Sequence, residues 1–257
     1  MHPMLNIALR AARDASNTIL EAVSRPNEIK VFEKGPNDFF TNIDKAVEDT
    51  LLYHLQKTYP THSFLCEESG VIEGEDSDTV WIIDPIDGTR NFMHGYPHFC
   101  ISIACKQGGK IQHGLIVDPV RNEEFSATKG QGAYLNGSRI RVGDCSSLEQ
   151  ATVSLACAGA ENYDTFLEIQ HRMKGKVSSF RFTGSSALDL AYIACGRLDA
   201  GWMAGMKFWD FAAGLLIASE AGALVSDAKG NPDCYDAKSL VFGNNRCFKQ
   251  LLKMMPA

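Results

Sequence analysis

The first 147 residues combine two helical patterns with a series of short apolar runs. Apolar side chains recur at helical spacing over residues 4–23, before Pro26, and again over 45–58, where Asp44 is a reasonable N-cap. Strands are expected at 30–33, 63–66, 80–83, 99–106, 111–117 and 123–128. We interpret residues 34–38 as a loop and Asn136-Gly137 as a hairpin turn. This part therefore predicts a helix pair over a largely antiparallel sheet.

After about residue 147 the pattern changes to strands that alternate with helices. The expected strands are 151–156, 178–182, 199–203, 223–227 and 239–243. The expected helices are 162–174, 185–195, 210–221 and 246–254. This alternation predicts a layered α/β structure. We expect the two halves, 1–147 and 148–257, to share one sheet system and form a single domain over residues 1–257.

Composition and charge narrow the classes of function. Hydrophobic residues make up 45% of the chain and charged residues 22%, a balance typical of a globular protein with its own core. The net charge is −6 and the basic residues are spread along the chain, which disfavours direct contact with nucleic acid. No uncharged apolar run approaches the ~20 residues that span a bilayer, and the N-terminus lacks the apolar segment of a signal peptide.

The eight cysteines carry no recognisable chemistry. None forms a C-x-x-C pair or a cluster with zinc-finger spacing, so a structural zinc is not expected. A chain that buries its own core does not need disulfides. We therefore expect reduced thiols and a cytoplasmic location.

Acidic residues follow two of the predicted strands. Glu67 comes directly after the run 63–66, and Asp84 after 80–83, with Asp87 beyond Pro85-Ile86. Neighbouring carboxylates repel each other unless a positive charge neutralises them, and divalent cations bind such oxygens. Taken alone, Asp84 and Asp87 would be better explained as caps of the turn that follows.

Gly88-Thr89 makes the metal interpretation stronger. A glycine lets the backbone approach a ligand closely, and free N–H groups at the start of a helix attract anions. Acids joined directly to such a segment favour a site for metal and phosphate together. Asp210, after Trp209, is by itself better explained as an acid stabilised by the first turn of a helix.

Three segments together resemble the inositol monophosphatase family. Asp84-Pro-Ile-Asp-Gly-Thr-Arg-Asn-Phe92 is similar to the first signature of that family, and Trp209-Asp-Phe-Ala-Ala-Gly214 to the second. Glu67-Glu-Ser-Gly70 is similar to a further metal-site element. The segments occur in the order of the family, the resemblance extends from the N-terminus to about Asn244, and it is closest to the bacterial SuhB branch.

The resemblance implies a layered α-β-α-β-α fold, usually in a homodimer, and an Mg²⁺ cofactor. The implied metal ligands are Glu67, Asp84, the Ile86 carbonyl, Asp87 and Asp210. The positions implied around the attacking water are Lys34, Asp38, Asp44, Glu67 and Thr89. Those implied at the substrate are Gly88, Thr89, Gly184, Ser185, Ser186 and Asp210. Without the resemblance, Lys34 and Asp38 would be loop residues, Asp44 a helix cap and Gly184-Ser185 the start of a helix.

One position departs from the family pattern. Members that hydrolyse inositol phosphates usually carry a glutamate seven residues before the aspartate of the second signature, whereas this chain has Met203. A thioether accepts hydrogen bonds poorly, so we expect hydrolysis to persist with a changed preference for inositol. We hypothesise that Lys207, near the same wall, favours a second anionic group on the substrate.

Two classes of function follow from these observations. The first is a Mg²⁺-dependent phosphomonoesterase that acts on inositol 1-phosphate or a related small phosphate ester, with sugar bisphosphates, nucleotide 3′-phosphates and histidinol phosphate also open. Metal-activated water would be the nucleophile. The second is a transcription antitermination factor of the SuhB type that binds the RNA polymerase machinery, with or without catalysis. The acidic charge of the chain favours a protein partner over direct RNA contact.

Overall fold

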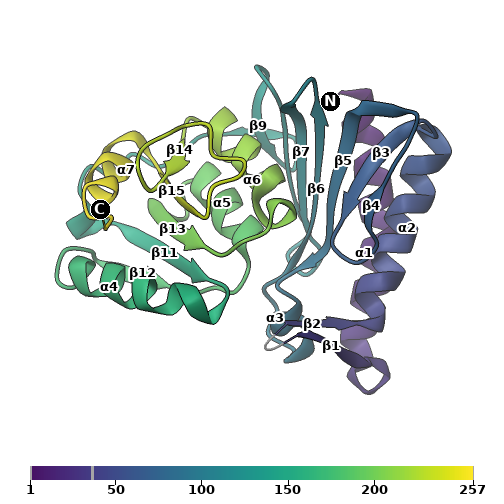
Figure 1. The fold of residues 1–257 in the computed structure, drawn as a ribbon, viewed down its shortest axis with the longest axis horizontal. Coiled ribbons are helices and arrows are strands. Elements are labelled where there is room, and N and C mark those ends of the chain that lie inside the picture. The colour runs from purple at the N-terminus through teal and green to yellow at the C-terminus, as the bar shows by residue number, and fades with distance from the viewer. Residues whose placement is uncertain (1, 36–37, 257) are drawn as a thin grey trace.

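Five layers of secondary structure follow one another across the molecule. The computed structural model describes residues 2–35 and 38–256. Figure 1 shows a helix pair, a large sheet, a second helix pair, a smaller sheet and outer helices side by side. This order confirms the predicted α-β-α-β-α architecture.

The outer helix pair of the first half is α1 (Pro3–Ser24) and α2 (Asn42–Thr58). Their apolar faces pack on one side of the large sheet and bury a core that includes Leu9, Ile19, Leu51 and Trp81. A short antiparallel ribbon, β1 (Val31–Gly35) with β2 (Asp38–Thr41), joins the two helices. Pro36 and Asn37 of the predicted loop lie outside the described residues.

The large sheet has the order β10-β9-β8-β7-β6-β5-β3-β4. Its strands are β3 (His62–Cys66), β4 (Gly70–Ile72), β5 (Asp76–Asp87), β6 (Cys100–Gln107), β7 (Lys110–Asp118), β8 (Glu123–Thr128), β9 (Gly132–Leu135) and β10 (Ser138–Ile140). Neighbours run antiparallel except β3 and β5, which are parallel. Since β3 and β5 run in the same direction and Cys66 pairs with Ile83, the residues that follow these two positions lie side by side.

The smaller sheet has the order β12-β11-β13-β15-β14 and mixes parallel and antiparallel pairs. Its strands are β11 (Thr152–Cys157), β12 (Ser179–Arg181), β13 (Ala200–Ala204), β14 (Leu224–Asp227) and β15 (Ser239–Gly243). The helices of this half are α4 (Tyr163–Met173), α5 (Ser186–Ala194), α6 (Phe208–Glu220) and α7 (Asn245–Leu252). Short helices complete the chain at Pro26–Glu28, Thr89–Met93 (α3), Leu148–Gln150 and Ala160–Asn162.

Three expectations from the pattern need correction. The halves do not share one sheet, because each builds its own and α5 and α6 lie between them. The N-cap of α2 is Thr41 rather than Asp44, since the Thr41 hydroxyl accepts the N–H of Ile43 and Asp44 bonds back to Thr41. Strand β5 extends past residue 83 to include Asp84 and Asp87.

Helix α6 joins the two halves because its residues are small. Ala212 and Ala213 contact the large sheet, while Phe211 and Ala218 contact the core beneath the small one. A Cβ atom on Gly214 would lie 2.6 Å from the Cβ of Leu190 in α5. A Cβ on Gly114 of β7 would lie 2.7 Å from the carbonyl oxygen of Ala213. Such close approach leaves no room for a larger side chain at either glycine.

No helix of the described residues is long and apolar enough to cross a membrane. All eight cysteines lie in the described part of the chain and none is in a disulfide, as expected for reduced thiols.

Gly214→Ala tests the packing between α5 and α6. Alanine favours a helix over glycine, so a free helix would gain stability from this change. Here we expect a loss of about 1–3 kcal/mol in the free energy of unfolding, because the added methyl group overpacks against Leu190. Urea denaturation measures it. Ser219→Ala, on the exposed face of α6, is the matched control, and equal stabilisation by both changes would contradict the packing argument.

Candidate active site

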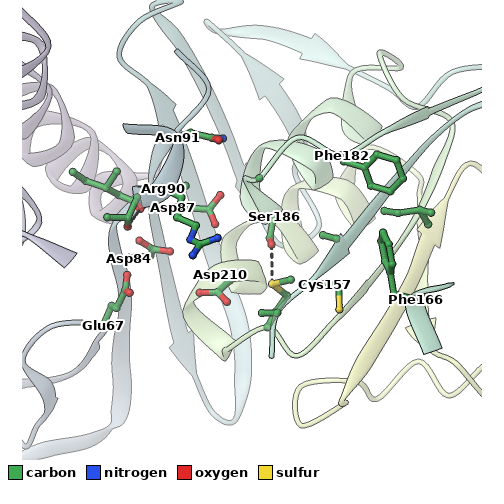
Figure 2. A pocket seen from close by; sticks show the side chains of 18 of the residues that line it. Glu67, Asp84, Asp87, Arg90, Asn91, Cys157, Phe166, Phe182, Ser186 and Asp210 are labelled. Carbon is green, nitrogen blue, oxygen red and sulfur yellow. Dashed lines mark hydrogen bonds between the residues drawn. The ribbon is translucent and has the colours of Figure 1, made fainter. Parts of the chain in front are cut away.

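A cavity of about 620 Å³ opens between the two halves of the chain. Figure 2 shows four carboxylates on one side, Glu67, Asp84, Asp87 and Asp210, and the rings of Phe166 and Phe182 on the other. The remaining lining residues come from the end of β5, α3, the end of β11 and the starts of α4, α5 and α6. Both halves therefore contribute to one site.

The paired strands β3 and β5 bring the first three carboxylates together. Glu67 follows β3, and its N–H donates to the carbonyl of Ile83 (3.1 Å), one residue before Asp84. Asp84 is 2% exposed and Asp87 is 6% exposed, both at the end of β5. Asp210 enters from the first turn of α6, where it accepts the N–H of Lys207 (2.7 Å). The sequence motifs thus meet only after the two sheets pack.

Burial and mutual repulsion raise the pKa of these acids. Burial raises the pKa of Glu67 to about 7 against the opposing charge of Lys34, and that of Asp87 to about 6 despite a hydrogen bond from Ser185. Burial, followed by the charges of the neighbouring carboxylates, raises the pKa of Asp84 and Asp210 well above the usual range. The site therefore holds more negative charge than the protein itself neutralises.

The protein supplies partners to some of these oxygens. Lys34 Nζ lies 3.2 Å from Glu67 Oε1 and 2.6 Å from Glu68 Oε1. Burial alone would lower the pKa of Lys34, but these carboxylates outweigh it and raise the pKa. Asp87 Oδ2 accepts hydrogen bonds from the Ser185 hydroxyl and the Ala187 N–H (3.0 Å). The loop Gly184–Ser186 thus contacts Asp87, as expected of a segment at this site.

Asp44 links the start of α2 to the site. Its Oδ2 accepts the N–H of Thr41 (2.8 Å), and its Oδ1 lies 3.2 Å from the Thr89 hydroxyl. The same hydroxyl lies 3.0 Å from the carbonyl oxygen of Ile86. Asp44 is fully buried, which raises its pKa although several hydrogen bonds oppose the shift. It is therefore both a helix-capping residue and the group that positions Thr89.

Gly88 has a backbone conformation that other residues rarely adopt, with φ of 98°. A Cβ there would lie 3.1 Å from the carbonyl oxygen of His98 and 3.2 Å from that of Gly184. Asn91 donates to the His98 carbonyl (2.7 Å) and to the Thr183 carbonyl (2.8 Å). These contacts fix the turn after β5 against the loop before α5, and Asn91 is a positioning residue that sequence analysis missed.

The donor set fits a hard divalent cation. All the candidate ligands are oxygens, and Mg²⁺ prefers carboxylate and carbonyl oxygens to nitrogen or sulfur. Asp84 Oδ1 is buried without a hydrogen-bond partner, which is costly unless a positive group compensates it. In the part of the chain that is described, no group of three or more acidic, histidine or cysteine side chains is already arranged so that it could hold a metal ion. Binding of the ion would therefore require the Glu67 carboxylate to turn away from Lys34 and the Asp87 carboxylate to turn away from Ser185.

The described residues that line the cavity do not include the predicted site residues Met203, Lys207 and Asp38. The prediction that Met203 lines the substrate site is wrong, because its side chain is 1% exposed and packs with Leu190 and Phe211 in the core. Lys207 is exposed and is not among the residues that line the cavity, so the wall expected from these two residues is not formed. The side chain of Asp38 lies outside the described part of the chain.

A buried acid behind the site was not found from the sequence. Asp189 of α5 is 1% exposed, and its Oδ1 accepts the Thr183 hydroxyl (2.8 Å) while Oδ2 has no partner. Burial raises its pKa to about 8, so the carboxyl is largely protonated at neutral pH. A single acid within the apolar stretch Ser186–Ala194 was the signal that could have identified it.

Asp189→Asn is expected to gain stability relative to the wild type as pH rises. The folded protein holds a proton on Asp189 up to about pH 8, whereas the unfolded chain releases it near the usual value for aspartate. Wild-type stability therefore falls across this window, and asparagine removes that dependence.

Melting temperatures at pH 5 and pH 8 measure the difference between the two proteins. Asp164→Asn, on the exposed part of α4, is the matched control. A constant difference between Asp189→Asn and the wild type at both pH values would contradict a protonated Asp189.

The fold and the cavity together define a layered α/β protein with an acidic site between its two halves. The family model for the inositol monophosphatase family matches residues 1–255, and the chain belongs to that family. It is 47% identical to the Nus factor SuhB of Pseudomonas aeruginosa over 258 residues, which covers 98% of this chain and 95% of the relative.

Solved structures agree with this assignment. The extragenic suppressor protein suhB from Bartonella henselae superposes with a TM-score of 0.96 at 36% identity and covers 98% of both chains. The IMPase of Thermotoga maritima has a TM-score of 0.89 at 33% identity, over 97% of this chain and 95% of its own.

Proposed function

We propose that this chain is a Mg²⁺-dependent phosphomonoesterase that hydrolyses a small phosphate ester. The observation that carries the proposal is a set of four carboxylates that line one cavity, the buried Asp84 and Asp87 and the partly buried Glu67 and Asp210. Together with the Ile86 carbonyl they would hold Mg²⁺ at the end of β5. When bound, Mg²⁺ lowers the pKa of a water ligand and offsets the charge of the phosphoryl oxygens.

Thr89 has the geometry to orient the attacking water. Its hydroxyl has one proton, which it directs either to Asp44 Oδ1 or to the Ile86 carbonyl. The lone pairs of the hydroxyl then remain free to accept a hydrogen bond from water. This acceptance leaves a lone pair of the water oxygen free to attack phosphorus. Asp44 acts through Thr89 and is a positioning residue in this scheme.

Positive groups around the cavity suit a phosphate. Arg90 lines the cavity and its guanidinium also lies 5.4 Å from the centre of the Phe39 ring. Lys34 lies against Glu67. The Glu67 carboxylate would turn away from Lys34 and towards the ion. Proton transfer to the leaving oxygen would come from solvent, because the open cavity admits water. We also propose that the chain forms a homodimer and is located in the cytoplasm, as expected from the sequence.

Phosphate release with and without Mg²⁺ tests this proposal. The substrates are inositol 1-phosphate, fructose 1,6-bisphosphate, a nucleotide 3′-phosphate and histidinol phosphate. We expect Mg²⁺-dependent turnover that falls at least about 100-fold in Asp87→Asn, because one charged ligand is lost.

Matched variants separate chemistry from folding. Asp49→Asn, an exposed change on α2, should keep full activity. Thr89→Val should lower kcat, whereas Thr89→Ser, which keeps the hydroxyl, should retain most of it. Absence of turnover on every substrate by a folded, Mg²⁺-loaded wild type would refute the phosphatase.

The second candidate is a transcription antitermination factor that binds the RNA polymerase machinery. This candidate is favoured by relatives of 42–47% identity that are named Nus factor SuhB. Such binding needs a surface and no catalysis, so both functions are compatible in one chain.

Binding to purified bacterial RNA polymerase separates the two candidates. We expect the wild type and Asp87→Asn to bind immobilised polymerase equally, since the buried Asp87 side chain presents little surface to a partner. Loss of binding in Asp87→Asn alone would tie the interaction to the catalytic site. No binding by either protein would contradict the antitermination candidate.

A further inference from the structure

The side of the cavity opposite the carboxylates is built from apolar and aromatic side chains. Figure 2 shows Phe166 and Phe182 facing the acidic side across the cavity. The residues of this wall are Leu155, Ala156, Cys157, Ala158, Tyr163, Phe166 and Phe182. Apart from the Tyr163 hydroxyl and the Cys157 thiol, their side chains offer no hydrogen-bonding group.

The rings of this wall support one another. The Phe166 ring lies 5.5 Å from that of Phe182 and 6.4 Å from that of Tyr163. It is backed by the buried indole of Trp202 at 6.4 Å. Phe182 also stacks on Phe180 at 6.2 Å with an interplanar angle of 21°. These contacts hold the rings as a preformed surface.

Two of these rings are exposed on that surface. Tyr163 and Phe182 are each 54% exposed, although aromatic rings of this size are usually covered. A flat apolar group in the cavity would cover them and stack on their faces. A polyol would instead leave its hydroxyl groups beside an apolar wall, where they lose hydrogen bonds with water.

Met203 adds no group to the cavity, because it is buried in the core. The methionine that lines the cavity is Met206, whose sulfur lies 3.0 Å from the Ser186 hydroxyl. The Ser186 hydroxyl is therefore engaged within the protein. The cavity volume of about 620 Å³ lies in the range of sites that enclose a ligand larger than a phosphate.

We propose that the preferred substrate is a phosphomonoester whose alcohol carries a planar aromatic ring, stacked on Tyr163 and Phe182 while the phosphate lies at the carboxylates. The inference rests on the proposed phosphatase function and specifies its leaving group. Hydrolysis breaks the bond between phosphorus and the alcohol oxygen. Water supplies the new oxygen on phosphorus and the proton on the released alcohol, so inorganic phosphate and the free aromatic alcohol are the products.

The first test compares 2-phenylethyl phosphate with glycerol 1-phosphate. Two carbons separate the ring from the ester oxygen, so the two leaving groups have similar basicity and the difference reports recognition. We expect kcat/KM for the aromatic ester to be about tenfold higher in the wild type. Phe182→Ala and Tyr163→Ala should each remove most of that preference, by lowering kcat/KM for the aromatic ester much more than for glycerol 1-phosphate, as expected for the loss of one stacking contact.

Leu167→Ala is the matched control for both variants. Leu167 lies on α4, the helix that carries Tyr163, is 55% exposed and does not line the cavity. It should leave the substrate preference unchanged. Equal kcat/KM values for both esters in the wild type, or equal loss for both esters in Phe182→Ala, would overturn the proposal.

A binding measurement distinguishes failure of this inference from failure of the phosphatase. Neither 3-phenylpropylphosphonate nor 3,4-dihydroxybutylphosphonate can be hydrolysed, and they match the two esters in length. Calorimetry compares their affinities for the Mg²⁺-loaded wild type and for Phe182→Ala. Tighter binding of the aromatic analogue that depends on Phe182 supports the aromatic subsite, even for a protein without turnover. Equal affinity for the two analogues overturns it.

The oligomeric state of the variants tests whether a second copy of the chain, rather than a substrate, covers this surface. If a second copy of the chain covers Tyr163 and Phe182, Phe182→Ala will change the mass measured by light scattering and leave the substrate preference intact. That result would also overturn the proposal. An unchanged mass together with a lost preference supports it.

Discussion

The repulsion between carboxylates gathered at the end of β5 is the constraint on which the site depends. Asp84 and Asp87 are almost fully buried, Glu67 and Asp210 approach from other elements, and burial raises the pKa of all four. A protein that used these residues only for stability would be better served by apolar side chains. The Asp84 oxygen without a partner marks the place where the protein itself supplies no compensation. A bound divalent cation is the simplest way to relieve that cost.

The rest of the fold holds this unfavourable cluster in place. The parallel pair β3 and β5 delivers Glu67 beside Asp84, and the small residues of α6 let Asp210 reach the same cavity from the other half. The polar network around Thr89, Asn91 and Ser185 then fixes the loops between these elements. Rigidity of this kind is required when a site is built from several distant segments, because a shift of one segment separates the ligands from each other.

The two sides of the cavity differ in what they recognise. The acidic side, which carries the motifs found in the sequence, is suited to a metal ion and a phosphoryl group. The aromatic side belongs to α4 and to the segment after β12, outside those motifs. Family membership is therefore compatible with a changed leaving group. It is equally compatible with a second role, since the name of the relatives, Nus factor SuhB, describes a factor and not a reaction.

The sequence alone determined most elements and the acidic motifs, because amphipathic periodicity and turn residues act locally. The ranges 4–23 and 239–243 match α1 and β15 to within one residue at each end. The tertiary structure decided what depends on distant contacts. It separated the halves into two sheets, buried Met203 and Asp189, and placed Tyr163 in one cavity with Asp84. No local pattern encodes these contacts, since each joins segments whose meeting is set by the packing of α5 and α6 between the sheets.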